Sequence, residues 1–224
     1  MNMPVTTRRL ELSLGSGDAM DVRRFRVSER MSGLFEVVVL AVCADAAVDL
    51  DAAVGTPASF TAHAHAGSSR TWAGIASRAR LVRAEERGLS TYEVTIVPRL
   101  WLLGQNADYR VFQHLSEPSI VDSVLGKWGV SRSAKLSSTY KKRKYRVQYG
   151  ESDLDFVCRM LEDAGVSFHF EEGDTMVLSD APEEAALRGP IPFRAEPSAW
   201  ESDLVTDLQV ERALRPGRGI SACV

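Results

Sequence analysis

The segment Lys144–Phe170 constrains the fold most strongly, because it combines a strand, a capped helix, a glycine stop and a second strand without interruption. Within it, Tyr145, Val147 and Tyr149 alternate with Arg and Gln residues. A period of two predicts a half-buried strand that carries aromatic and branched side chains on one face and polar side chains on the other. The chain must therefore contain at least one sheet that packs beside a helix.

A helix is predicted to begin at Asp153. Ser152 precedes it as an N-cap residue, and Asp155 holds the third helical position, a short form of the capping box. The helix dipole favours both carboxylates at this end, so we interpret the acidic cluster Glu151–Asp153 as capping and not as an acid/base pair for hydrolysis. Gly165 follows the last periodic residue and predicts a left-handed stop. The apolar stripe that docks the helix comprises Leu154, Phe156, Val157, Cys158, Met160 and Leu161.

Strand periodicity resumes after the helix. Val166, Phe168 and Phe170 alternate with polar residues, and a turn around Gly173 leads to a returning strand over Thr175–Ser179. This pattern predicts a hairpin directly after the helix.

The stretch from Gln148 to Phe170 resembles the signature of the valine-glycine repeat (VgrG) spike proteins of type VI secretion systems and of related phage tail hubs. Further parts of the likeness begin at Phe25, Trp72, Tyr92 and Tyr109, so that it covers roughly residues 20 to 215. We assign structural roles to the residues that carry the signature, which are Gln148, Tyr149, Glu151, Ser152, Asp153, Phe156, Arg159, Glu162 and Gly165.

The resemblance implies a structural hub without bond chemistry or cofactors. In this family, paired barrel-like domains from three chains form a pseudo-sixfold ring that matches a hexameric tube protein, so the implied partners are two further copies, the tube and baseplate proteins. Relatives continue into an oligonucleotide-binding-fold-like barrel and a valine-glycine needle, and neither follows Val224 here. We therefore expect a weak, concentration-dependent trimer or a monomer.

Composition argues against two general classes of binder. A net charge of −3 and a pI near 5.9 give no overall attraction for nucleic acid or anionic membranes. Arg8 and Arg9 are not followed by the apolar stretch of an export signal, so we expect no membrane anchor and assembly in the cytoplasm. The three cysteines, Cys43, Cys158 and Cys223, lack metal-binding spacing and are interpreted as reduced thiols.

Short strands separated by turn signals run from Arg8 to Pro98, and Phe35–Val42 is an apolar strand that suits the core of a sandwich or barrel. After Pro98 the pattern becomes mixed, with a helical turn at Leu100–Leu103 stopped by Gly104 and a helix over Pro118–Trp128. Later strands are predicted at Ile191–Arg194 and Leu204–Val210. The sequence thus predicts a β-rich α+β fold with two antiparallel barrel-like domains, residues 1–104 and 105–224, and helices inserted in the second.

Three patterns could carry other functions. His63 and His65 could share a metal on one strand face and support the alternative of a small effector or metal-dependent hydrolase, although no further ligand is in register. His114 and His169 are isolated. Lys141–Lys144 could contact phosphates or an acidic partner, but a basic run that enters an edge strand also protects that edge from pairing with other chains.

Overall fold

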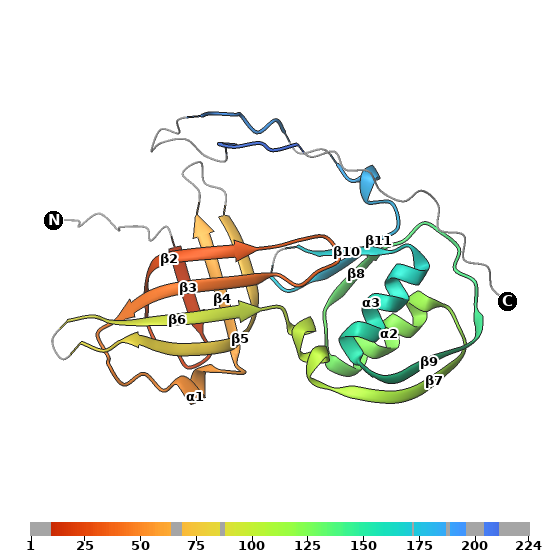
Figure 1. Ribbon diagram of the computed structural model, residues 1–224, viewed down its shortest axis with the longest axis horizontal. Helices are drawn as coiled ribbons and strands as arrows, with labels where there is room; N and C mark the ends of the chain where they lie inside the picture. Colours follow the sequence, from red (N-terminus) through yellow and green to blue (C-terminus); the bar gives the residue numbers. More distant parts are fainter. Residues whose placement is uncertain are drawn as a thin grey trace, which may run out of the picture.

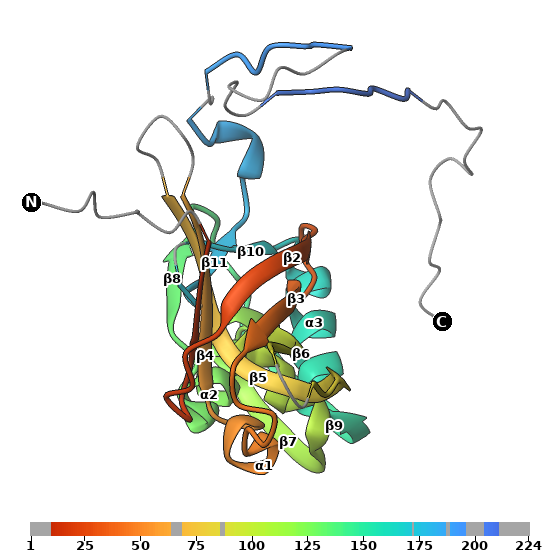
Figure 2. The same cartoon turned by 90° about the vertical axis from the view of Figure 1, so that its left-hand side faces the viewer.

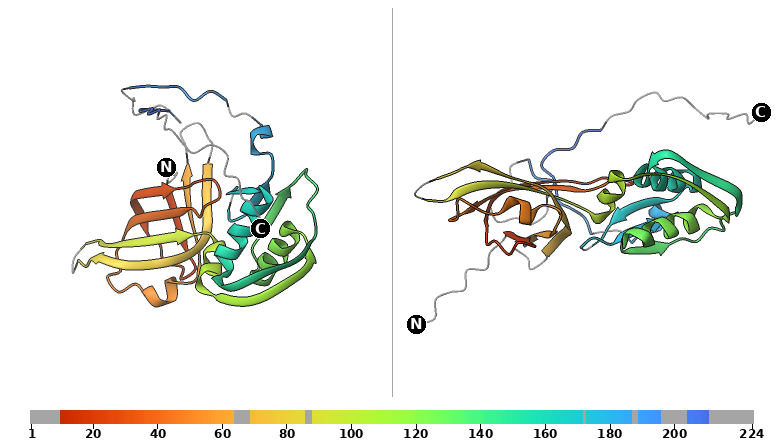
Figure 3. Two further views of the ribbon diagram at one scale, coloured as in Figure 1. Left: turned by 45° about the vertical axis from the view of Figure 1, so that its right-hand side comes forward. Right: turned by 90° about the horizontal axis from the view of Figure 1, so that it is seen from below.

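The computed structural model describes residues 10–63, 69–85, 88–171, 173–186, 189–195 and 204–210 of the chain. The first half of the chain forms a strand-rich unit and the second half a mixed unit beside it (Figures 1 and 3). Each unit has its own cluster of buried apolar side chains. The predicted β-rich α+β class is confirmed.

The first unit is a six-stranded antiparallel sheet with the order β1-β4-β5-β6-β3-β2. The edge strands β1 and β2 contact each other because the sheet curls into a half-barrel (Figure 2). A short helix, α1 (Leu50–Ala53), lies in the connection between β3 and β4. The strands are β1 (Leu10–Leu14), β2 (Asp21–Ser28), β3 (Glu36–Cys43), β4 (Pro57–His63), β5 (Ser69–Arg83) and β6 (Ser90–Val97).

Alternating apolar residues fill the inside of this curl. On β3, Val37, Val39 and Ala41 are completely buried, as the apolar run in the sequence predicts. Phe60 of β4 is equally buried and lies against the Trp72 ring, with 6.0 Å between the ring centroids. Burial of a large apolar side chain contributes about 1.5–3 kcal/mol each, so this cluster supplies the main stabilisation of the unit.

In the second unit, two helices pack between two small sheets. The helices are α2 (Glu117–Trp128) and α3 (Asp153–Ala164), and both begin and end close to the predicted positions. An antiparallel pair, β7 (Ala107–Leu115) with β9 (Arg143–Ser152), covers one side. On the other side the order is β10-β11-β8, in which the pair β11–β8 is parallel. These last strands are β8 (Arg132–Lys135), β10 (Ser167–Phe170) and β11 (Met176–Ser179).

Each of the two helices ends at a glycine. Gly104, in contrast, does not end the 3-10 helix that precedes them in the chain. Gly129 and Gly165 adopt φ values of 64° and 68°, and the Gly165 N–H bonds the Glu162 carbonyl at 3.0 Å. Gly104 has no left-handed backbone, so the 3-10 helix η1 (Arg99–Gln105) continues through it, and the predicted stop at Gly104 is wrong. A second 3-10 turn, η2, spans Pro182–Glu184.

Backbone hydrogen bonds join the two units. The Ser32 N–H donates to the Phe168 carbonyl at 2.7 Å, and the Ala73 N–H donates to the Gly173 carbonyl at 3.2 Å. Next to this junction, at the start of η1, the Arg99 N–H donates to both carboxylate oxygens of Asp174, at 3.1 and 3.0 Å. Because main-chain atoms make most of these bonds, the junction depends little on surface side chains.

The predicted strands Ile191–Arg194 and Leu204–Val210 do not form. One parallel bridge joins Phe193 to Val205 instead. A two-stranded ribbon needs a third strand or a covering layer to be stable, and here Ile191, Phe193, Leu208 and Val210 remain exposed. The alternation of apolar residues therefore predicts two strands, but the described part of the chain contains no neighbouring strand with which they could pair.

Candidate functional site

The ribbon β7–β9 has its tyrosine and valine side chains outside, whereas its inner face carries Arg110, Arg146 and Gln148 beside Phe112. Tyr145, Val147 and Tyr149, which were expected on the half-buried face, are 61%, 36% and 80% exposed. Gln148, on the opposite face of the same strand, is completely buried. The prediction for this face was wrong because the helices beneath the ribbon present buried carboxylates, which polar side chains can satisfy and tyrosine rings cannot.

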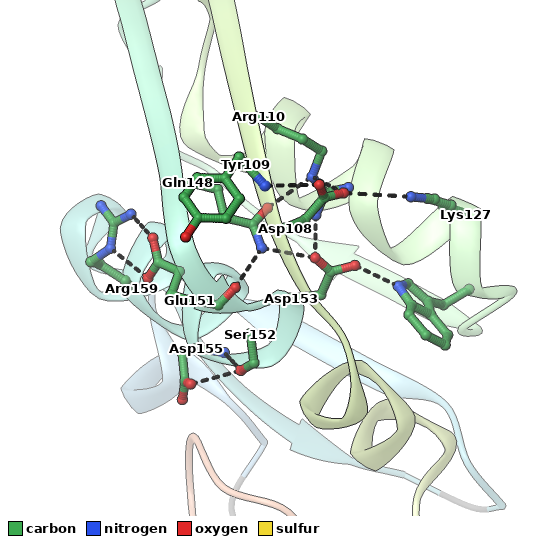
Figure 4. Close-up of polar contacts among 11 residues, drawn as sticks. Asp108, Tyr109, Arg110, Lys127, Gln148, Glu151, Ser152, Asp153, Asp155 and Arg159 are labelled. Atoms are coloured by element: carbon green, nitrogen blue, oxygen red, sulfur yellow. Dashed lines mark hydrogen bonds and ion pairs between the residues drawn. The ribbon is translucent and has the colours of Figure 1, made fainter.

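Asp153 is the centre of the first polar cluster (Figure 4). Its carboxylate is completely buried at the start of α3 and forms an ion pair with Arg110 of β7. The Gln148 side-chain amide and the Trp128 indole N–H each donate to it at 2.8 Å. Arg110 in turn donates to the Gln148 carbonyl oxygen at 2.8 Å, so four side chains from β7, α2, β9 and α3 close one network.

These partners keep Asp153 ionised. Burial opposes the charged form, but hydrogen bonds from Gln148 and Trp128, with the positive charges of Arg110 and Lys127, outweigh it and hold the pKa below its ordinary value. The Asp153 backbone N–H also donates to the Asn106 carbonyl at 3.0 Å. Asp153 therefore ties the start of the helix to the strand region beside it.

Glu117 forms a second buried cluster at the start of α2. Its side chain is 3% exposed and accepts from Arg143 at 2.8 Å and also from Arg146. Arg146 reaches Asp163 of α3 at 3.2 Å. Burial raises the pKa of Glu117, but hydrogen bonds from Arg146, a backbone N–H and Arg143 outweigh this effect. The pKa is therefore below its ordinary value, and the carboxylate stays charged.

Together the two clusters fix the orientation of the ribbon. A slip of one residue in a strand exchanges its two faces, which would remove Gln148 and Arg146 from the carboxylates and leave buried charges unpaired. Breaking a buried ion pair in this way costs about 3–5 kcal/mol. The charges therefore hold the tyrosines and valines on the outside.

The outer face consists of cross-strand pairs. Tyr109 lies opposite Tyr149, with the rings edge to face and their centroids 5.2 Å apart. Val111 lies opposite Val147, and Gln113 lies opposite Tyr145. We call these exposed residues the tyrosine–valine face, which comprises Tyr109, Val111, Tyr145, Val147 and Tyr149. A contiguous exposed apolar strip of this kind marks an interaction surface in soluble proteins.

The remaining signature residues make the local contacts of α3. The Ser152 hydroxyl accepts from the Asp155 N–H at 3.0 Å, as the capping pattern predicts. Glu151 pairs with Arg159, whose guanidinium also donates to the Val147 carbonyl at 3.0 Å. Phe156 is completely buried and stacks on Phe112 of β7 with 5.4 Å between centroids. The side chain of Glu162 is exposed, and its carbonyl accepts from the N–H of Gly165.

Sequence reasoning did not identify four members of the two clusters. These members, Arg110, Trp128, Glu117 and Arg146, lie on three elements, β7, α2 and β9, and only the fold brings them together. One signal was available: Arg110 and Arg146 both occupy the positions that alternate with the apolar residues of their strands. Two strands that share this pattern indicate a polar inner face.

The metal alternative gains no further ligand from the described residues. His63 Nε2 lies 3.4 Å from a Glu11 carboxylate oxygen, and His65 lies outside the residues that the structure describes. Within the described ranges, no three His, Cys, Asp or Glu side chains gather as a metal site would require. His114 lies in β7, and His169 Nε2 is 3.7 Å from Glu171.

Two of the three cysteines lie in the described part of the chain and are free thiols, Cys43 and Cys158. Burial raises the pKa of the Cys158 thiol to about 11. Cys223 lies outside the described ranges. None of the helices in the described parts combines the length and apolarity that crossing a bilayer requires.

Comparisons with known proteins agree with this architecture. The spike protein VgrG1c of the type VI secretion system of Pseudomonas aeruginosa is 31% identical over 210 residues, which cover 89% of this chain and 28% of the relative. The spike protein VgrG1a of the same organism is 29% identical over 222 residues, covering 94% of this chain and 34% of the relative. The chain thus spans about a third or less of these relatives, and the resemblance to spike proteins is confirmed.

Solved structures share the fold. The E. coli c3393 protein, described as a type VI secretion component with structural similarity to the T4 bacteriophage tail proteins gp27 and gp5, superposes with a TM-score of 0.72 at 24% identity, over 82% of this chain and 52% of that chain. The 43 kDa tail protein of prophage MuSo2 from Shewanella oneidensis gives a TM-score of 0.61 at 16% identity, over 82% of this chain and 58% of that chain. The family model of the phage tail baseplate hub (GPD) matches residues 28–221. With that match over most of its length, the chain belongs to the phage tail baseplate hub family.

Proposed function

We propose that this chain is a structural hub module of a contractile injection spike. Three copies form a ring that docks onto the hexameric tube protein and contacts baseplate proteins, and the ring assembles in the cytoplasm. The observation that carries this proposal is the match to type VI spike proteins, which runs through both packed units and covers 89% of the chain. The chain performs no bond chemistry in this role.

The packing of the molecule supports a role based on shape. Each unit has an apolar core, and main-chain hydrogen bonds such as Ser32 to Phe168 join the units. Buried carboxylates fix the ribbon β7–β9 against the helices. These features suit a part that holds its geometry while a ring of subunits is built on it, and the signature residues from Gln148 to Gly165 serve that geometry.

We also propose that the two units correspond to two hub domains, as the division at residues 104 and 105 predicts. Leu100 and Leu103 of η1 pack into the core of the second unit. This packing favours a domain boundary at about Pro98, a few residues before the boundary that is predicted at Gly104.

Two measurements test the proposed function. Light scattering over a concentration series is expected to show a mass that rises from monomer toward trimer, because the interface area must offset the entropy of association. Co-sedimentation with assembled tube protein is expected to recover the chain with the tubes, and an intact spike relative should displace it. A chain that stays monomeric at every concentration and does not bind the tube protein would refute the proposal.

A further inference from the structure

Two stretches of this chain carry charges of one sign only. Residues 123–150 contain eight Lys and Arg residues and no Asp or Glu, whereas residues 31–69 contain four Asp and Glu residues and no Lys or Arg. The basic stretch leads into β9 in the second unit, and the acidic stretch includes α1 in the first. In Figure 1, α1 lies on the first unit and the ribbon β7–β9 lies on the second.

The basic stretch lines the rim of the tyrosine–valine face. Lys141, Lys142 and Lys144 directly precede Tyr145 and are exposed. Among the described residues they have no ion pair or hydrogen-bond partner, in contrast to Arg143 and Arg146, which bond Glu117. The ribbon thus presents an apolar strip beside three free positive charges.

The acidic stretch has complementary features at Ala44–Val54, the connection that contains α1. Its aspartates, Asp45, Asp49 and Asp51, are exposed and have no Lys or Arg partner within the described parts of the chain. Five of the other eight residues of this segment are alanine, and Val54 is 41% exposed. Small side chains leave a shallow surface on which protruding tyrosine rings can lie, and the aspartates can pair with lysines at its rim.

The size of the face indicates how strong such a contact is. Tyr109, Tyr145 and Tyr149 are 70%, 61% and 80% exposed, which together equals about two whole side chains. A tyrosine buries about 150–250 Å², so the three rings offer about 300–500 Å². A stable interface needs about 800 Å² per partner, so this face alone supports a weak contact that gains strength when several copies join.

We propose that the tyrosine–valine face and its lysine rim bind the acidic segment Ala44–Val54 of a second copy of this chain. Because the two surfaces differ and belong to different units of the chain, the contact is head to tail, and its repetition closes a ring when the rotation between copies permits. The assignment rests on the proposed trimeric hub and names the surfaces that would join its subunits.

Charge exchange and self-association test the assignment. The double substitution K142E/K144E is expected to weaken association at least about tenfold, since like charges then face each other across the contact. D51K is expected to do the same, and the combined triple variant should regain most of the loss. The matched control for D51K is E183K, which also replaces an exposed carboxylate with lysine but lies on η2, outside the proposed contact. It should leave association unchanged. Sedimentation velocity at low and high salt provides the readout, and added salt should weaken only the wild-type contact and its charge-restored counterpart.

A photo-crosslinking amino acid in place of Tyr149 locates the contact directly. In a mixture of isotope-labelled and unlabelled chains, we expect crosslinks between different copies that map to Ala44–Val54. Trimers that form with unchanged affinity in all charge variants, or crosslinks between copies that map elsewhere on the chain, would overturn the assignment and leave the hub proposal standing. A wild-type chain that neither self-associates nor binds the tube protein would overturn both.

Discussion

Removal of the Asp153 carboxylate gives the sharpest test of how the ribbon is held. In Asp153→Ala, the Trp128 indole N–H and the Gln148 amide lose a buried acceptor, and Arg110, whose side chain is 20% exposed, loses its buried partner. Breaking a buried ion pair costs about 3–5 kcal/mol. Arg110 keeps a second carboxylate, Asp108, at 3.3 Å, so we expect the lower end, about 3 kcal/mol.

Urea unfolding followed by far-UV circular dichroism measures this loss. Asp155→Ala is the matched control, because it removes a carboxylate from the exposed side of the same helical turn; its cost should stay below about 1 kcal/mol. The double variant Arg110→Met/Asp153→Ala should lose less free energy of unfolding than the two single variants lose in sum. The expected coupling energy between the two residues is about 1–3 kcal/mol.

Acid should remove the difference between wild type and Asp153→Ala. The folded pKa of Asp153 lies below its ordinary value of 3.8, so its stabilisation is complete above that pH and is lost as the pH falls through the folded pKa. A cost below about 1 kcal/mol for Asp153→Ala at neutral pH, or additive single changes, would show that the network does not hold the ribbon.

Three further predictions concern stability. Ser152→Ala should cost about 1 kcal/mol in urea unfolding, whereas Ser116→Ala at the start of α2 should cost clearly less, because Ser116 makes no capping bond; equal costs would contradict the capping role. Gly74→Ala should lower the thermal midpoint sharply, since its Cβ would lie 2.0 Å from the Val97 carbonyl oxygen. Gly126→Ala, at an exposed position with open space in the last turn of α2, should instead raise stability by about 0.5–1 kcal/mol. Burial raises the pKa of Asp174 to about 6, although the Arg99 N–H donates to both of its carboxylate oxygens. The stability that Asp174 contributes is therefore full below its ordinary pKa and is lost as the pH rises through about 6. Asp174→Asn should flatten this decline when the free energy of unfolding is measured between pH 4 and 7.

Local patterns predict the elements of this fold better than they predict which face of each element is buried. The cap at Ser152, the stop at Gly165 and the apolar run of β3 depend on neighbouring residues, and all three appear as expected. The burial of Gln148 depends on Arg110 and Trp128, which are 38 and 20 residues away along the chain. Alternation shows that two faces differ but does not show which face meets the helices, and that choice was made wrongly for Tyr145 and Tyr149.

The same limit explains the candidate site. The signature segment contains Asp153, and its charge could be assigned to the helix dipole from sequence alone. Gln148 is its only main partner within the segment, while Arg110 and Trp128 come from β7 and α2, so the buried network could not be predicted from the segment. The predicted strand at Leu204–Val210 failed for a related reason, because periodicity describes a strand's side chains but not whether a neighbouring strand exists.

The free lysines beside the ribbon also bear on solubility before assembly. Each strand of a two-stranded sheet has an unpaired edge, and β7 and β9 carry exposed tyrosine and valine side chains, a composition that favours aggregation through further strand pairing. Lys141, Lys142 and Lys144 give every copy the same positive charge at this place, and identical copies that approach ribbon to ribbon therefore repel each other. The lysines thus act as gatekeepers that keep newly made chains dispersed.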